Sequence, residues 1–171
     1  MSLNALAEGI DLLNEWLGKI AAWSVFATVI ITFTVVIFRY GFTQFYSIAL
    51  YESALYFHAM IFMLGAAYTL KHDQHVRVDI FYHNLTARKQ AVINIFGALF
   101  LLIPVCIFIV WVSSDYVLDS WKNLEGSREA GGLPFVFILK SLIPLMAVLL
   151  LLQAFSSLIH ALNQLTTKGE Q

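Results

Sequence analysis

Residues 20–38 read IAAWSVFATVIITFTVVIF, an uninterrupted stretch without a charged side chain. As an α-helix this stretch is roughly 28 Å long, close to the ~30 Å hydrocarbon core of a bilayer. A helix satisfies its own backbone hydrogen-bonding groups, which is what an apolar segment needs in lipid. The stretch therefore predicts a membrane-spanning helix, closed by Lys19 at one end and Arg39 at the other.

Three further stretches have the same character. They cover residues 48–70, 91–112 and about 135–161, and each is long and apolar enough to cross a membrane. Too few residues remain for a separate soluble domain, so we expect residues 1–171 to form a single membrane domain. The predicted fold class is an all-α integral membrane protein with four transmembrane helices.

The composition supports this prediction and argues against other classes of protein. Hydrophobic residues make up 60% of the chain and charged residues only 12%, with a mean hydropathy of +0.77. A soluble domain has about 25% charged residues. The formal net charge of -1 provides no basic surface for nucleic acid, and the single cysteine, Cys106, cannot form an intrachain disulfide.

Residues 1–19 show helical periodicity and lead directly into the first span. Leucine and isoleucine recur every three or four positions, whereas Glu8, Asp11 and Glu15 fall on other faces. A secretory signal would begin with basic residues, so we expect the first span to stay in the mature protein. The common role of such an amphipathic helix is to rest at the membrane interface, and the alternative is to dock on another subunit. The acidic polar face favours docking, because interfacial helices usually carry Lys or Arg toward anionic lipid.

The segment 71–90 mixes charged and apolar residues. We expect a turn followed by a short interfacial helix between spans two and three. His72, His75 and His83 fall in this segment, but their spacing matches no zinc pattern and no cysteine completes one. The sequence predicts no metal site.

The distribution of basic residues predicts the orientation. With four spans, both termini and the middle loop share one side of the membrane. Six basic residues lie on that side: Lys19, Lys71, Arg77, Arg88, Lys89 and Lys168. The other side carries Arg39, Lys122 and Arg128, with Lys140 just inside the fourth span. Because cytoplasmic loops are enriched in Lys and Arg, both termini are expected in the cytoplasm.

Two charged residues fall inside spans, where charge is costly and therefore marks a candidate site. Glu52 lies near the start of the second span and Lys140 near the start of the fourth, at similar depths below the same membrane surface. Arg39 marks the same level at the end of the first span. We expect Glu52 to pair with Lys140 or Arg39, as a structural contact rather than a proton carrier.

Other polar and special residues indicate no catalytic chemistry. Histidines 58 and 160 lie roughly 20 Å apart in depth, too far for the two axial ligands of a haem. Pro104 and Pro144 predict kinks in the third and fourth spans, and Gly65 lies in a small-residue surface suited to a close helix contact. No nucleophile–base set or phosphate loop is present, so neither an enzyme nor a cofactor is expected.

The outer loop, residues 113–134, is rich in charged and aromatic side chains. Aromatic residues here usually anchor a helix at the headgroup level, whereas an acidic cluster also suits contact with a soluble partner outside the membrane. The candidates for that contact are Asp115, Asp119, Trp121, Glu125 and Arg128.

These residues carry a resemblance to a known family. Glu52 at the start of the second span, the Leu-Gly-Ala step at 64–66, and the His-Val-Arg-Val-Asp motif at 75–79 resemble the small membrane (DctQ-type) subunit of tripartite ATP-independent periplasmic (TRAP) transporters. The Phe-Arg-Tyr end of the first span at 38–40 and the four-span plan are also similar. Within the outer loop, Ser-Trp at 120–121 and Ala-Gly-Gly-Leu-Pro at 130–134 resemble the mannitol, chloroaromatic or keto-acid branch.

The resemblance implies a role in a three-part importer of the bacterial inner membrane. A periplasmic binding protein would deliver an organic acid to a large elevator-type subunit, which holds the substrate and sodium sites. This chain would be the scaffold for the large subunit, surrounded by membrane lipids. The candidate structural or partner-contact residues are Glu52, Lys140, Arg39, Gly65, His75, Arg77 and Asp79.

Two alternatives remain open. One is an independent four-helix, proton-coupled transporter with Glu52 as its coupling site. Small multidrug transporters of that kind carry their essential Glu deep in the first span, but here that span has no ionisable residue before Arg39. The other is a membrane anchor subunit of a redox complex, for which the mismatched depths of His58 and His160 are the obstacle.

Overall fold

The computed structural model describes residues 3–75 and 85–167, and these fold into long helices. Helix α1 (Leu3–Tyr40) is unbroken over 38 residues, about 57 Å. The expected continuity between the amphipathic start and the first span is confirmed. At its end Gly41 and Phe42 donate backbone hydrogen bonds to the carbonyl of Ile37, at 2.7 and 3.3 Å. A short 3-10 helix, η1 (Thr43–Phe45), then leads to α2 (Ile48–Lys71).

The second half of the chain begins with three helical segments that run on from one another. Helix α4 (Ala87–Gly97) passes through a π-helical stretch, η2 (Ala98–Leu102), into α5 (Ile103–Lys122). Pro104 has no backbone N–H to donate to the preceding turn, and the wider π-helical turn lies directly before it. The kinks expected at Pro104 and Pro144 stay predictions. The expected interfacial helix between spans two and three falls largely on residues 76–84, outside the described residues.

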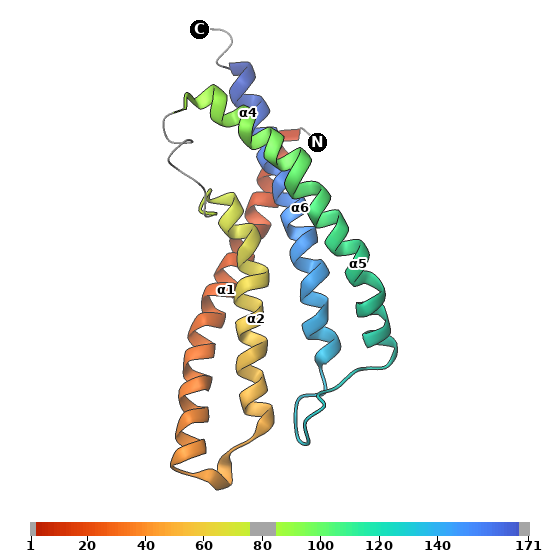
Figure 1. The fold of residues 1–171 in the computed structure, drawn as a ribbon. Coiled ribbons are helices and arrows are strands. Elements are labelled where there is room, and N and C mark those ends of the chain that lie inside the picture. Colours follow the sequence, from red (N-terminus) through yellow and green to blue (C-terminus); the bar gives the residue numbers. More distant parts are fainter. Residues whose placement is uncertain (1–2, 76–84, 168–171) are drawn as a thin grey trace.

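Helix α6 (Val136–Thr167) is the last element, and it continues through Pro144. It packs against α1, α2, α4 and α5 and so forms the centre of the bundle (Figure 1). Four helical segments in the described part of the chain are long and apolar enough to cross a membrane: Leu3–Tyr40, Ile48–Lys71, Arg88–Lys122 and Val136–Asn163. The predicted all-α fold with four spans is confirmed.

Small residues let the helices approach closely at the middle of the bundle. Ala21 on α1, Ala67 on α2 and Leu149 on α6 are buried together. Gly18 is required at the α1–α2 contact, since a Cβ atom there would lie 2.2 Å from the Cδ2 atom of the Tyr68 ring. Gly65 faces Ala21 in the same region, so the expected small-residue surface is used inside this chain.

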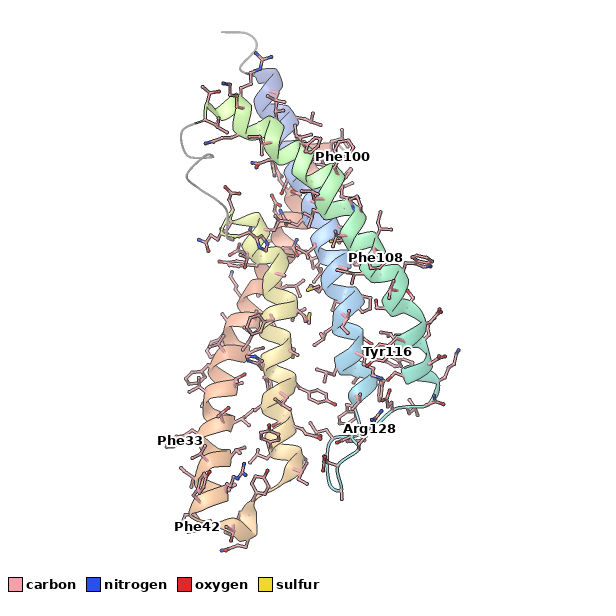
Figure 2. The ribbon with its side chains drawn as sticks, viewed as in Figure 1. Phe33, Phe42, Phe100, Phe108, Tyr116 and Arg128 are labelled. Atoms are coloured by element: carbon pink, nitrogen blue, oxygen red, sulfur yellow. The ribbon has the colours of Figure 1, made fainter. Side chains whose placement is uncertain are left out.

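The outward faces of the helices are apolar. Figure 2 shows Phe33 and Phe108 pointing away from the bundle, and they are 66% and 57% exposed. The two ends of the described chain lie at one end of the bundle, whereas η1 and the loop between α5 and α6 lie at the other (Figure 1). An even number of spans requires this arrangement.

Candidate functional site

Glu52 is held by the loop between α5 and α6. One carboxylate oxygen accepts a short hydrogen bond from the hydroxyl of Ser127, and the other accepts one from the backbone N–H of Leu133 at 2.6 Å. The loop closes on itself here, because the N–H of Ser127 donates to the carbonyl of Leu133 at 2.9 Å. A Cβ atom on Gly132 would collide with the Ser127 hydroxyl and lie 2.8 Å from the Glu52 carboxylate, so a larger residue would have to displace one of these side chains.

Lys140 is held by the same loop through a different carboxylate. Its ammonium group donates to Glu125 at 2.5 Å and lies 3.9 Å from the centre of the Tyr116 ring. The Lys140 side chain is only 14% exposed. Ser120 also donates to Glu125, at 2.7 Å. The hydrogen bond from Lys140, assisted by the one from Ser120, holds the pKa of Glu125 below its ordinary value.

The expected pairing of Glu52 with Lys140 or Arg39 is therefore wrong. Glu52 and Lys140 do lie at the same end of the bundle, as their positions within the spans predict. However, the loop between α5 and α6 folds back over this end and supplies nearer partners to each: Ser127 and Leu133 to Glu52, and Glu125 to Lys140. We call Glu52, Ser127, Leu133, Glu125 and Lys140 the loop cluster.

The remaining outer-loop candidates divide into two kinds. The indole N–H of Trp121 donates to the hydroxyl of Ser141 at 2.8 Å, so this residue, like Glu125, joins α5 or its loop to α6. Asp115, Asp119 and Arg128 are exposed, and Asp119 pairs with neighbouring Lys122 at 2.9 Å. Only these three candidates offer charged groups that the fold leaves at the surface.

The other candidates lie apart from the loop cluster. Arg39 is exposed at the end of α1, with its guanidinium 6.0 Å from the ring centre of Tyr40. His75 is exposed just after α2. Arg77 and Asp79 lie outside the described residues.

A second polar cluster joins the start of α1 to the end of α6. Asp11 accepts hydrogen bonds from Ser156 at 2.7 Å and from Gln153 at 2.9 Å, and its second oxygen lies 2.9 Å from the Nε2 atom of His160. The side-chain amide of Asn14 donates to Gln153 at 2.7 Å. Asn14, Gln153 and Ser156 are all buried. We call these five residues the helix ladder.

The helix ladder changes the interpretation of the amphipathic start. Asp11 of the polar face turns inward to α6, and Glu15 turns inward to α2, where Lys71 donates to it at 2.6 Å and His72 lies 3.1 Å away. Two of the three carboxylates that favoured docking thus have partners within the chain, and Glu8 remains exposed. The apolar residues of this segment divide: Ile10 is buried, whereas Leu12 and Trp16 are each 60% exposed.

Sequence reasoning missed most of the helix ladder and the donors of the loop cluster. A signal for the ladder was present: Gln153, Ser156 and His160 follow one another at helical spacing in an apolar span, and Asp11 and Asn14 do so in α1. The donors to Glu52 gave no such signal. One is the hydroxyl of Ser127, in a loop without periodicity, and the other is the backbone N–H of Leu133. Among the described residues no group of three or more His, Cys, Asp or Glu side chains could hold a metal ion.

The geometry is that of polar side chains that join helices within a multi-pass membrane protein. The sequence matches a family model described as "Tripartite ATP-independent periplasmic transporters, DctQ component" over residues 28–164, most of the chain. No curated protein and no solved structure matches it. The matched segment includes the whole loop cluster, and the family consists of transporter components rather than enzymes. The chain therefore belongs to the DctQ component family of the tripartite ATP-independent periplasmic transporters.

Proposed function

We propose that this chain is the static scaffold of its transporter. It would support a large elevator-type subunit during sodium-coupled uptake of an organic acid. The observation that carries the proposal is that charged side chains of the long helices are bound within the chain. Glu52, Lys140 and Asp11 are each bound to another helix or loop of the same chain, and the outward faces are apolar. Such a chain resists internal movement and offers its exterior to lipid or to a membrane partner.

The periplasmic binding protein is the proposed partner of the exposed outer-loop charges. Asp115, Asp119 and Arg128 remain at the surface at the end of the bundle that carries the α5–α6 loop. With both termini in the cytoplasm of the inner membrane, that end faces the periplasm. The Ser-Trp and Ala-Gly-Gly-Leu-Pro stretches of this loop favour the mannitol, chloroaromatic or keto-acid branch.

The two alternative functions have less support. A proton-coupling carboxylate must exchange its proton with solvent or substrate, but both oxygens of Glu52 already accept hydrogen bonds from the loop. For haem, His58 lines a groove with Thr28, whereas His160 bonds to Asp11. Thr28 and Asp11 are roughly 25 Å apart along α1, so these histidines cannot ligate one iron.

Co-purification and transport test the scaffold role. The tagged chain is expressed with the large TRAP subunit of the same organism, purified in detergent and reconstituted with the binding protein under a sodium gradient. We expect a stable one-to-one complex, with no transport by the large subunit alone. A chain that purifies alone and moves a solute in liposomes would contradict the proposal.

A Glu52→Gln variant separates scaffolding from coupling. Glutamine replaces one of the two acceptor oxygens by an NH2 donor, so the loop loses a hydrogen bond and we expect assembly and transport to fall together. Intact assembly with abolished sodium-coupled transport would assign Glu52 to coupling instead.

A further inference from the structure

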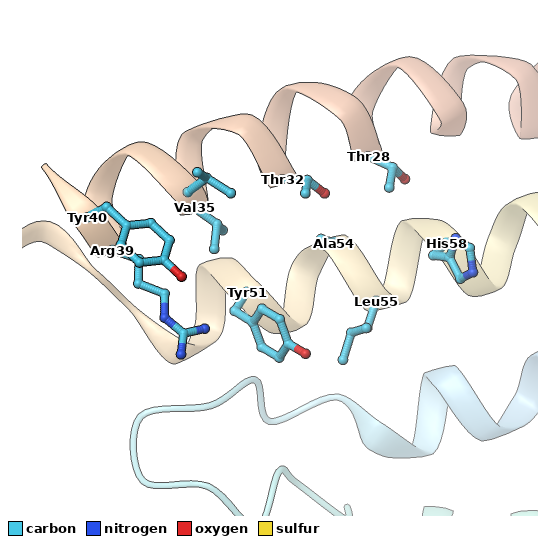
Figure 3. Close-up of a pocket in the computed structure, with 10 residues that line it drawn as sticks. Thr28, Thr32, Val35, Arg39, Tyr40, Tyr51, Ala54, Leu55 and His58 are labelled. Atoms are coloured by element: carbon cyan, nitrogen blue, oxygen red, sulfur yellow. The ribbon is translucent and has the colours of Figure 1, made fainter. Parts of the chain in front are cut away.

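A groove of about 410 Å³ lies between α1 and α2 at the end of the bundle that carries η1. Figure 3 shows Thr28, Thr32 and Val35 of α1 facing Ala54 and His58 of α2. Its volume is within the range of small-molecule sites, ~300–1,000 Å³. None of the hydrogen bonds or ion pairs described above lies in this groove.

One end of the groove is cationic and amphipathic. Arg39, Tyr40 and Tyr51 gather there (Figure 3). Lys140 and Lys122 each have a carboxylate partner, whereas Arg39 has none among the described residues. A guanidinium presents paired donors that match the oxygens of a phosphate.

The length of the groove matches one leaflet of a membrane. From Arg39 to Thr28, α1 rises about 16 Å, close to half of the ~30 Å hydrocarbon core. Arg39 follows the last residue of the apolar stretch 20–38, so its guanidinium lies at the headgroup level while the walls lie at acyl-chain depth. Tyr40 and Tyr51 are the residue type enriched at that level.

We propose that this groove binds an anionic membrane phospholipid, with its phosphate on Arg39 and one acyl chain between α1 and α2. The unpaired cation selects a phosphate in a headgroup of net negative charge. The apolar walls, such as Val35 and Leu55, take the chain. A lipid held there fills the space between α1 and α2, beside the buried Val35.

Native mass spectrometry of the purified full chain tests the proposal. The chain is titrated with phosphatidylglycerol and, separately, with phosphatidylcholine of the same acyl chains. We expect one bound lipid with a preference for phosphatidylglycerol. Arg39→Gln should weaken phosphatidylglycerol binding by about fivefold and phosphatidylcholine binding by less, which removes the preference between the two lipids. Arg128→Gln removes an exposed arginine from the outer loop and should change neither.

A second pair of variants tests the acyl-chain part of the groove. Ala54→Phe fills the space and should weaken both lipids, whereas Ala22→Phe, at an exposed position of α1 outside the groove, should weaken neither. Circular dichroism and a monodisperse elution profile confirm that each variant folds.

Three results would overturn the proposal. The first is equal binding of the two lipids by the wild-type chain. The second is unchanged phosphatidylglycerol binding by folded Arg39→Gln or Ala54→Phe. The third concerns the complex with the large subunit: Leu55→Cys cross-links to that subunit and the complex retains no lipid. The large subunit would then occupy the groove.

Discussion

Replacing Asp11 with alanine removes the acceptor on which the helix ladder depends. The hydroxyl of Ser156 and the amide of Gln153 donate to it at 2.7 and 2.9 Å, and these two side chains are 0% and 2% exposed. In the variant the buried amide of Gln153 loses its acceptor, whereas the hydroxyl of Ser156 still has the carbonyl of Ala7 at 3.3 Å. The change therefore leaves one buried donor without its partner rather than simply deleting a surface contact.

The expected cost follows mainly from the Gln153 donor. A buried donor without an acceptor costs about 1–3 kcal/mol, and hydrogen bonds between membrane helices average about 0.6 kcal/mol. We therefore expect Asp11→Ala to lower the free energy of unfolding by about 1–3 kcal/mol. The half-exposed His160 contributes little to this sum, because surface ion pairs are worth ~0–1 kcal/mol. Asp11→Asn keeps one acceptor oxygen and should lose about half as much.

Unfolding of the full chain by sodium dodecyl sulfate in mixed micelles, followed by circular dichroism, measures these changes. Glu8→Ala is the matched control, because it removes a carboxylate from an exposed position in the same part of α1 and should cost less than ~0.5 kcal/mol. If Asp11→Ala unfolds at the same detergent fraction as Glu8→Ala, the helix ladder does not stabilise the bundle and the reasoning fails.

Two further predictions concern the loop cluster. Gly132→Ala should push Ser127 away from Glu52 and speed proteolysis of the α5–α6 loop. Gly9→Ala is the control, because the space around its Cβ is open, and it should be neutral or stabilising. Equal cleavage of the loop in both variants would contradict this. The pKa of Glu125 is lowered in the folded chain, so the unfolded state binds its proton more tightly. The stability that Glu125 supplies is present above pH 4.5, its ordinary pKa, and should be lost as the pH falls below that value toward the folded-state pKa. Melting curves at stepwise lower pH should show this loss in the wild-type chain and a smaller one in Glu125→Gln; parallel curves would refute it.

The helices could be predicted from the sequence because their cause is local. An apolar run as long as 20–38 has one stable arrangement in lipid, and the structure places helices over all four such runs. Their ends were harder to predict. Helix α6 continues to Thr167, beyond the predicted end at about residue 161, and there the amide of Asn163 donates to the side chain of Asn4 on α1 at 2.9 Å.

The partners within the loop cluster could be predicted only in part. The depth of Glu52 and Lys140 follows from their distance to the span ends, and this placed them at the correct end of the bundle. Which group each one contacts depends on how the loop folds between the helices. Backbone donors such as the N–H of Leu133 are the same in every residue type except proline, so sequence alone does not distinguish them.

The helix ladder also constrains the order of events during biosynthesis. Asn14 and its partner Gln153 are separated by 139 positions in the chain. At about 5–20 residues per second, translation of that interval takes roughly 7–28 s. During this time the first helix has emerged while its inward polar side chains still lack their acceptors and donors. Closure of the bundle therefore waits for the last helix, and a ribosome that stalls before residue 153 leaves a folding intermediate with the polar face of α1 uncovered.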